Sequence, residues 1–227
     1  MKTKLFLIFC LLLTGLFICT ALILAANPPT STSAELKPIQ LLPPQTDGGR
    51  PLMQVLKDRK SSREFSTEKL QPQVLSNLLW AAFGISRPDS GKRTAPSAVN
   101  WQEIDVYVAM AEGLYLYEAK GHTLQPVLAQ DVRAAAGIQP FVKDVPVNLI
   151  YVADFTKMGK ASPDDKVFYS AADTGFISEN VYLYCASEGL ATVVRNLIDK
   201  PALSKIMKLK PEQRVILAQS VGYPKKQ

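Results

Sequence analysis

The sequence predicts an α+β domain, in which helices pack against a sheet. Segments with helical spacing of apolar residues and β-rich segments follow one another in an irregular order along the chain. The 227 residues are 47% hydrophobic and 20% charged, which is enough for one full-sized domain with a core or for two small ones. With 16 Pro, 12 Gly and 3 Cys, the chain does not match collagen-like, disulfide-scaffold or disordered proteins.

The first 26 residues have the pattern of an export signal. Lys2 and Lys4 precede Leu5–Ala26, a run of 22 residues without a charge. Two interpretations stay open: a signal peptide cleaved near residues 19–21, and an uncleaved membrane anchor through residues 5–26. A buried core helix is a third, less favoured alternative, because the run has no polar residues at the regular spacing that would mark a solvent-facing side. Either export interpretation predicts a periplasmic body, or one on the outer face of the cytoplasmic membrane.

A linker and one domain follow this segment. Residues 27–49 are rich in Pro and Gly and predict an extended tether, partly packed near Ile39–Leu42. Residues 50–227 form the predicted domain. Cys10 and Cys19 lie in the export segment, so Cys185 alone remains in an exported body and no intramolecular disulfide is expected.

The elements of the domain are predicted from apolar periodicity. Helical spacing predicts helices over 51–59, 71–83, 130–136, 163–189 and 201–209. Alternation and β-rich composition predict strands over 104–110, 113–118, 145–153, 190–194 and 214–221, with a polar loop over 86–94. The long helix 163–189 has few charges on either face, which favours a core or a subunit interface.

Several classes of function are disfavoured by what the chain lacks. The net charge of +6 is weak, and no basic stripe with interleaved aromatics predicts nucleic-acid binding. No Gly-rich dinucleotide loop, Walker loop or Cys pair with metal spacing is present, so no metal site is expected. The single histidine, His122, falls in the predicted turn 119–122 and is expected to be a loop residue, so no catalytic side chain is assigned.

Three stretches could nevertheless bind a ligand. Residues 59–65 read Arg-Lys-Ser-Ser-Arg-Glu-Phe, and such cations and hydroxyls can clamp a phosphate. The alternative is a solvated helix end whose cations offset the helix dipole. Residues 93–102 combine small residues with Asn100 and Gln102, which suits a flat ligand but also an ordinary polar loop. Residues 222–226 are a basic end that could equally be a solvated tail.

Taken together and in this order, these stretches resemble the FMN-dependent nitroreductase family. The likeness runs from about Ile39 to Lys226 and is greatest to the branch with the azoline oxidases of azole-modified peptide synthesis. It rests on Leu42–Pro44, the 59–65 motif, Leu78–Ile85, Thr94–Ala98, Ile104–Val108 and Gly113–Tyr117. The resemblance implies a nitroreductase-like α+β fold, with a mixed central sheet flanked by helices, and a homodimer with flavin sites across its interface.

The resemblance also implies a set of FMN-binding residues. Arg59, Ser61 and Arg63, with Lys60 beside them, match the motif that holds the phosphate and ribityl chain. Pro96, Ser97, Ala98 and Asn100 match the loop along the isoalloxazine. Asn196 and Leu197 match the position where a backbone N–H faces the flavin N5, and many relatives have Glu-Gly there. Lys225 matches a cation near the phosphate. Gln139 is a further implied residue.

The expected function is that of an exported FMN-dependent oxidoreductase of the nitroreductase type. Hydride would pass through the flavin to a small organic acceptor in a ping-pong cycle, with NAD(P)H or another electron donor. The donor stays open because export would separate the protein from the nicotinamide pool. A non-catalytic exported flavin-binding protein is the alternative, and a structural envelope protein with a degenerate site is a third. The azoline-oxidase likeness concerns the fold, because no peptide-recognition module is present.

Overall fold

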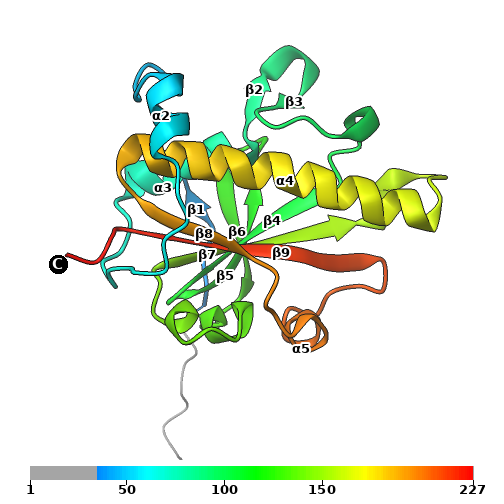
Figure 1. Ribbon diagram of the computed structural model, residues 1–227. Helices are drawn as coiled ribbons and strands as arrows, with labels where there is room; N and C mark the ends of the chain where they lie inside the picture. Colours follow the sequence, from blue (N-terminus) through cyan, green and yellow to red (C-terminus); the bar gives the residue numbers. More distant parts are fainter. Residues whose placement is uncertain (1–34, 227) are drawn as a thin grey trace, which may run out of the picture. The chain divides into compact units, whose positions relative to one another are not determined.

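An antiparallel sheet of seven strands organises residues 35–226, the part of the chain that the computed structural model describes (Figure 1). The predicted export segment 1–26 and the first part of the linker lie outside the described residues. Within residues 35–226, no helix combines the length and apolarity needed to cross a membrane.

The strand order is β1-β6-β5-β4-β7-β9-β8. The strands are β1 Ile39–Gln40, β4 Ile104–Met110, β5 Gly113–Glu118, β6 Thr123–Leu128, β7 Val147–Asp154, β8 Ala191–Arg195 and β9 Gln213–Gly222. Every pairing in this described sheet is antiparallel, so the prediction of a mixed sheet is wrong. Tight turns join β4 to β5 and β5 to β6, and such short connections impose antiparallel pairing.

Most predicted helices are confirmed with small shifts at their ends. The helices are α2 Leu52–Asp58, α3 Pro72–Phe83, α4 Pro163–Glu188 and α5 Lys200–Ile206. Proline at the first position of α3 and glycine after its end explain why that helix matches its prediction closely.

Three predicted segments differ from the structure. The helix predicted over 130–136 is only a 3₁₀ turn, Arg133–Ala136, and residues 86–94 contain a small hairpin of β2 Ile85–Arg87 and β3 Lys92–Arg93. The linker contributes strand β1, whose pairing with β6 places the side chain of Leu41 in the core. These elements are too short to produce a periodic signal.

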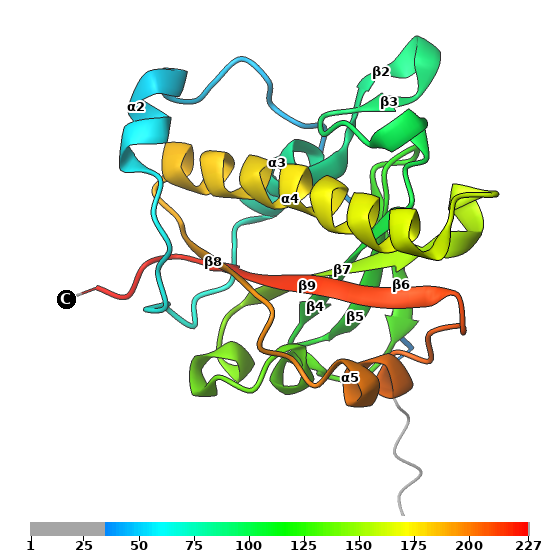
Figure 2. The ribbon, with the colours of Figure 1, turned by 45° about the vertical axis from the view of Figure 1, so that its right-hand side comes forward.

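The sheet is covered on both faces, as Figures 1 and 2 show with α4 across one face and α5 on the other. Alternate residues of one strand therefore enter different cores: Val108 packs in the core under α3 and α4, and Ala109 in the core with α5. This explains why β4 and β7 are buried along most of their length and why β7 reads as a continuous apolar run.

Helix α4 buries only part of its surface. Ser162 caps its start by accepting a hydrogen bond from the Asp165 N–H, and Gly189 ends it with a φ of 70°. Ile177 and Val181 on its inner stripe are fully buried, whereas Phe168 and Phe176 are 66% and 49% exposed. The predicted core role is confirmed for the inner stripe, and the outer stripe is an exposed apolar surface.

Candidate functional site

The predicted phosphate-binding segment runs beside the edge of the sheet. Helix α2 ends at Asp58, and the chain then extends along β8, where the Ser62 N–H donates to the Thr192 carbonyl at 2.9 Å. The Ser66 N–H donates to the Tyr223 carbonyl at 2.8 Å. The edge strand β8 and the residues that follow β9 therefore hold the backbone of this segment in place.

Tyr182 of α4 organises the first half of this segment. Its hydroxyl shares a hydrogen bond of 2.8 Å with the Ser61 hydroxyl and accepts another, at 3.0 Å, from the Val194 N–H. The guanidinium of Arg59 lies over the Tyr182 ring, 5.2 Å from its centroid. One buried tyrosine thus links the segment to the end of β8.

The cations of this segment form no ion pair within the described residues, although Glu64 lines both of the cavities described below. None of the five ion pairs there involves Arg59, Lys60, Arg63 or Lys225. The Lys225 N–H donates to the Glu64 carbonyl at 3.3 Å, which brings the C-terminal cations to the segment. Cations with adjacent hydroxyls are the donor set that a phosphate monoester requires.

The side chains of the segment line two neighbouring cavities. Arg63, Phe65 and Lys225 line a cavity of about 900 Å³, in which the rings of Phe65 and Phe141 stack at 5.6 Å. Lys60 lines a cavity of about 370 Å³, which Lys225 also reaches. Lys60 therefore lies beside the predicted clamp and faces a different cavity from Arg63.

Asn196, Leu197 and Gln139 lie at the same end of the molecule. Asn196 and Leu197 follow β8 directly and are exposed, and the Leu197 carbonyl accepts from the Ile138 N–H at 3.2 Å. Gln139 comes next in the chain and precedes the 3₁₀ turn with Phe141. The three residues therefore lie near one another after the Arg195 end of β8, and Phe141, two residues beyond Gln139, connects them to the predicted phosphate-binding segment by stacking on Phe65.

A buried arginine supports this arrangement. Arg195 donates from Nη1 to the Ala136 carbonyl and from Nη2 to Oδ1 of Asn148, both at 2.9 Å, while its Nε has no partner among the described residues. Burial lowers the pKa of Arg195 to about 10. A Cβ at residue 137 would collide with the guanidinium, so Gly137 is required for this close approach.

The loop Pro96–Gln102 has an unusual backbone. Val99, Asn100 and Gln102 adopt φ values of 51°, 59° and 49°, a left-handed region that is costly for a β-branched residue such as valine. The loop is nevertheless fixed, because Oγ of Ser97 accepts from the Gln102 N–H at 3.0 Å. The loop also contacts helix α4, because the Trp101 ring packs edge to face against the Tyr169 ring, with 5.8 Å between the ring centroids.

A pair of buried carboxyl groups anchors this loop. Oδ2 of Asp173 accepts from the Ala98 N–H at 2.8 Å, and the carboxyl of Asp173 faces that of Glu103. Glu103 is completely buried, and neither of its oxygens has a donor among the described protein groups. Burial, and then the neighbouring Asp173, raise the pKa of Glu103 to about 7, and burial also raises that of Asp173. Because two ionised carboxyl groups that are buried from water would repel each other, one of them keeps its proton to a higher pH than an exposed carboxyl group does.

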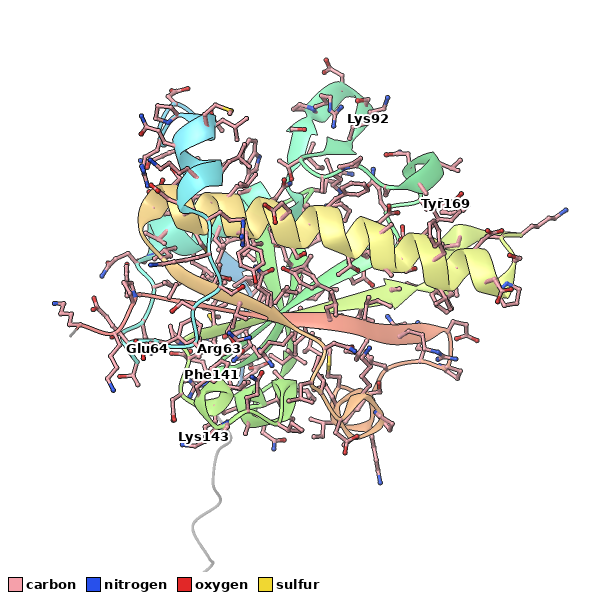
Figure 3. All side chains as sticks on the ribbon, in the orientation of Figure 1. Arg63, Glu64, Lys92, Phe141, Lys143 and Tyr169 are labelled. Carbon is pink, nitrogen blue, oxygen red and sulfur yellow. The ribbon has the colours of Figure 1, made fainter. Side chains whose placement is uncertain are left out.

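The two predicted halves of the flavin site lie on opposite sides of α4 within one chain. Asp173 and Tyr182 are nine residues apart, which is about 14 Å along a helix and half a turn around it. Figure 3 shows Arg63 and Phe141 at one end of the molecule and Tyr169, beside the 96–102 loop, at the other. The structure places Arg59, Ser61, Arg63 and Lys225 on and beside the 59–66 segment, and it places Asn196 and Leu197, with Gln139 near them, after the other end of β8. Pro96, Ser97, Ala98 and Asn100 lie on a separate loop, which Asp173 holds.

His122 has a structural position, as its place in a turn predicts. Its Nε2 lies 2.7 Å from the Ser76 hydroxyl and its Nδ1 lies 2.9 Å from the Tyr117 hydroxyl. Burial lowers the pKa of His122 and favours the neutral ring. Among residues 35–226, no group of three or more His, Cys, Asp or Glu is placed to hold a metal ion.

Four residues of the site were not found from the sequence: Glu103, Asp173, Tyr182 and Arg195. Each lies inside or next to a segment whose apolar periodicity predicts a helix or a strand. The sequence around each residue therefore indicates secondary structure and gives no sign of a ligand-binding site. Acidic and basic residues at positions that the pattern buries are the one available signal, and Asp173 shows it within the apolar stripe of α4.

Comparison with known proteins identifies relatives along most of the chain. The model of the nitroreductase family matches residues 56–223. A Methanocaldococcus jannaschii protein assigned to the nitroreductases is 30% identical over 169 residues, which cover 70% of this chain and 85% of that protein. The crystal structure of a Ralstonia eutropha protein with the same assignment shows 41% identity and a TM-score of 0.81, covering 88% of this chain and 94% of that one.

More distant structures share the fold alone. The Escherichia coli microcin synthetase complex McbBCD matches at 18% identity and a TM-score of 0.64, over 90% of this chain and 85% of that chain. The NADPH:FMN oxidoreductase of Vibrio harveyi, solved with NAD⁺, matches at 16% identity and a TM-score of 0.58, over 77% and 69%.

Proposed function

The chain belongs to the nitroreductase family and is an oxidoreductase of that family, and from this premise we propose that it is an FMN-dependent enzyme that reduces small organic acceptors. The observation that carries the proposal is the cation cluster at the edge of the sheet, which has the chemistry of a phosphate site. The NADPH:FMN oxidoreductase of Vibrio harveyi, which has the same fold, supports the choice of FMN.

Arg59, Ser61 and Arg63 would hold the FMN phosphate, with Lys225 adding charge from the C-terminus. The hydrogen bond between Ser61 and Tyr182 and the stacking of Arg59 on the Tyr182 ring orient two of these side chains. These side chains therefore lose part of their conformational entropy when the protein folds, and less remains to be lost when FMN binds. Lys60, which faces the adjacent cavity, would contribute charge and no direct bond.

When bound, FMN would supply the redox chemistry by taking a hydride from a donor and passing electrons to the acceptor in a second half-reaction. The chain's own part is to bind and to orient. Exposed backbone at Asn196-Leu197 would place an N–H beside the flavin ring, and the 96–100 loop would lie along its face. The buried carboxyl pair keeps that loop in its left-handed conformation through the Ala98 N–H.

We propose that the site is completed in a homodimer. Helix α4 has exposed apolar residues on its outer stripe, and helix α2, which lies beside it (Figure 1), has two more, Leu52 and Met53, which are 61% and 76% exposed. An exposed apolar face of this kind is typical of an interface. A second copy would bring its own 96–100 loop to the cation cluster, which one chain alone does not do.

We propose that the protein works outside the cytoplasm, because the sequence of residues 1–26 has the export pattern. A non-catalytic exported flavin-binding protein is the second candidate. Asn196-Leu197 favours it, since many relatives have Glu-Gly at this position and the local contacts to the flavin would differ. We propose a likeness to the azoline-oxidase branch on the six sequence motifs given above, and the fold shared with the microcin synthetase complex supports it.

The test is an absorbance scan of the purified protein after incubation with FMN and desalting. Retained bands of oxidised flavin are expected, and anaerobic addition of NADH or NADPH should bleach them. Reoxidation by a quinone or nitroaromatic compound would complete the cycle and support the enzyme. Retained bands that no donor bleaches would favour the flavin-binding protein, and a colourless folded protein would refute both.

A further inference from the structure

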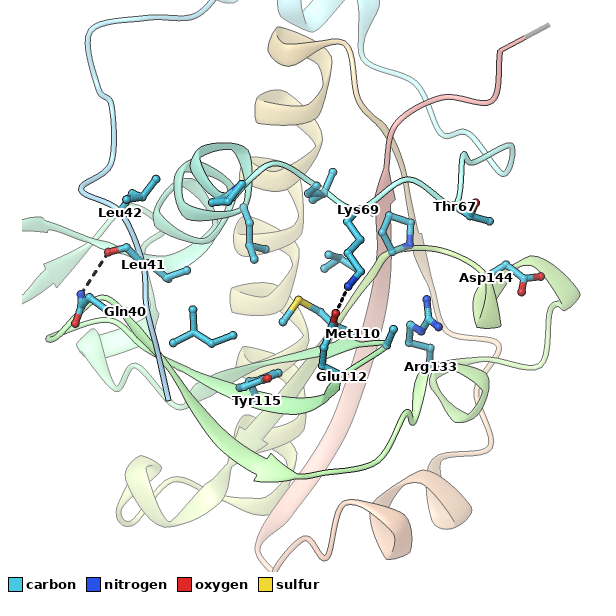
Figure 4. Close-up of a pocket in the computed structure, with 17 residues that line it drawn as sticks. Gln40, Leu41, Leu42, Thr67, Lys69, Met110, Glu112, Tyr115, Arg133 and Asp144 are labelled. Atoms are coloured by element: carbon cyan, nitrogen blue, oxygen red, sulfur yellow. Dashed lines mark hydrogen bonds and ion pairs between the residues drawn. The ribbon is translucent and has the colours of Figure 1, made fainter. Parts of the chain in front are cut away.

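A second cavity lies away from the cation cluster, between the start of α3 and the sheet (Figure 4). Its volume is about 640 Å³, which is within the range of small-molecule sites. Four segments that are distant in sequence enclose it: residues 39–42, 67–75, 110–115 and 144–147. None of the residues proposed to bind FMN lines it.

The walls of this cavity are apolar. Leu41, Leu70, Leu75, Met110 and Val147 contribute side chains, and three of them are also core residues, with exposed fractions of 5%, 9% and 2% for Leu41, Leu70 and Val147. Rigid core side chains form the wall, so the cavity has a defined shape that does not depend on mobile surface groups. Such a wall favours an apolar ligand body.

The charged groups around the cavity are paired with one another. Lys69 forms an ion pair with Glu112 at the mouth, as Figure 4 shows. Arg133 pairs with Asp131 at 2.7 Å, and Asp144 pairs with Lys143 at 2.9 Å. These pairs leave no uncompensated charge at the rim, in contrast to the cation cluster, so the cavity favours a neutral ligand.

Tyr115 contributes a hydroxyl group to the wall of the cavity (Figure 4). The residue is 3% exposed, and no hydrogen bond joins its hydroxyl to another residue of the described range 35–226. The hydroxyls of three other buried tyrosines, Tyr117, Tyr151 and Tyr182, do have partners, which are His122, Gln219 and Ser61 respectively. Because this hydroxyl is on the wall of the cavity and is not among the fully buried polar atoms, it is a donor that a ligand in the cavity could use.

We propose that this cavity binds a neutral, lipophilic small molecule with one hydrogen-bond acceptor, such as an aromatic ketone, which accepts from the Tyr115 hydroxyl. The apolar walls hold the hydrocarbon body, and the hydroxyl selects for a carbonyl oxygen. This site is separate from the proposed FMN site, and the inference does not depend on flavin binding.

The test is a competition experiment on the full-length protein in mild detergent, with the neutral dye N-phenyl-1-naphthylamine, whose fluorescence increases in apolar surroundings. Two competitors of similar shape are compared: 2-acetylnaphthalene, which has an acceptor, and 2-ethylnaphthalene, which has none. We expect saturable displacement at one site by both, with the ketone bound about fivefold more tightly, the ratio for one net hydrogen bond. Absence of saturable dye binding above the detergent blank would overturn the proposal.

Two variants locate the site. Tyr115→Phe keeps the ring and should bring the ketone to the affinity of the hydrocarbon, with the hydrocarbon unchanged. Leu75→Trp should fill part of the cavity and weaken both competitors at least tenfold, whereas Ile206→Trp on α5, outside the cavity, should weaken neither. An unchanged ketone preference in Tyr115→Phe would refute the assigned donor. Dye binding that survives in a folded Leu75→Trp protein would place the site elsewhere, and if that variant does not fold, the Tyr115→Phe comparison decides alone.

Discussion

The substitution Glu103→Gln tests whether the buried carboxyl pair shares a proton. The Glu103 carboxyl is fully buried against Asp173, which itself holds the Ala98 N–H. An amide at position 103 can donate an N–H to the Asp173 carboxylate without a shared proton. The variant should therefore keep the geometry of the loop and lose the ionisation.

The magnitude follows from the raised pKa. Glu103 titrates near 4.5 in an unfolded chain and near 7 in the folded protein. Below pH 4.5 the group is protonated in both states, so it has no effect on the pH dependence. As the pH rises from 4.5 to 7, the unfolded chain releases the proton first and the free energy of unfolding falls. The loss is about 3 kcal/mol in total and is complete above pH 7.

Urea unfolding of wild type and variant between pH 4.5 and pH 8.5 measures this directly. We expect the variant to gain about 3 kcal/mol relative to wild type across this range, because it lacks the titrating group. Glu68→Gln, at an exposed position, controls for the loss of a charge. A constant difference between Glu103→Gln and wild type over the whole range would refute the shared proton.

Three further variants test other parts of the structure. Gly137→Ala should cost at least about 2 kcal/mol in urea unfolding, because the new Cβ displaces the buried Arg195 guanidinium from its hydrogen bonds; a loss below about 0.5 kcal/mol would contradict that packing. Val99→Gly should raise the free energy of unfolding by roughly 0.5 kcal/mol, since relief of left-handed strain exceeds the added entropy of glycine, and a clear destabilisation would show that the valine side chain is needed. Phe168→Glu with Phe176→Glu should convert the proposed dimer to a monomer in sedimentation velocity with little change in Tm, because both rings are exposed; an unchanged oligomeric state would exclude this face.

Long, strongly patterned elements could be predicted from the sequence. Helix α3 begins at Pro72 and ends before Gly84, two signals that act locally, and β4 matches its predicted bounds of 104–110. Strand β1 could not be predicted, because it is only two residues long. Its pairing with β6 and the burial of the adjacent Leu41 stabilise it, and both depend on the tertiary fold. The direction of pairing was also wrongly predicted, since it depends on connections between elements and not on residue type.

Of the candidate site, too, one part could be predicted from the sequence and another part could not. The cations of residues 59–63 are visible as a motif because charge and spacing are properties of a short segment. Their support is not visible, since Tyr182 reaches them from a helix more than a hundred residues later. The partnership of Glu103 with Asp173 likewise depends on tertiary packing. Sequence motifs therefore indicate the residues that could touch a ligand, and the fold is needed to show what positions them.

The central claim is that the cations at the edge of the sheet bind the FMN phosphate. Equilibrium titration with FMN and with riboflavin, which lacks the phosphate, tests it most directly, in wild type and in Arg59→Ala/Arg63→Ala. Wild type should bind FMN far more tightly than riboflavin, and loss of two charge-assisted contacts should weaken FMN by about 3–6 kcal/mol while riboflavin changes little. Lys205→Ala/Lys210→Ala, which removes two exposed cations elsewhere, should leave both affinities unchanged. Equal loss of FMN and riboflavin in the arginine variant, or no loss of FMN, would contradict the account.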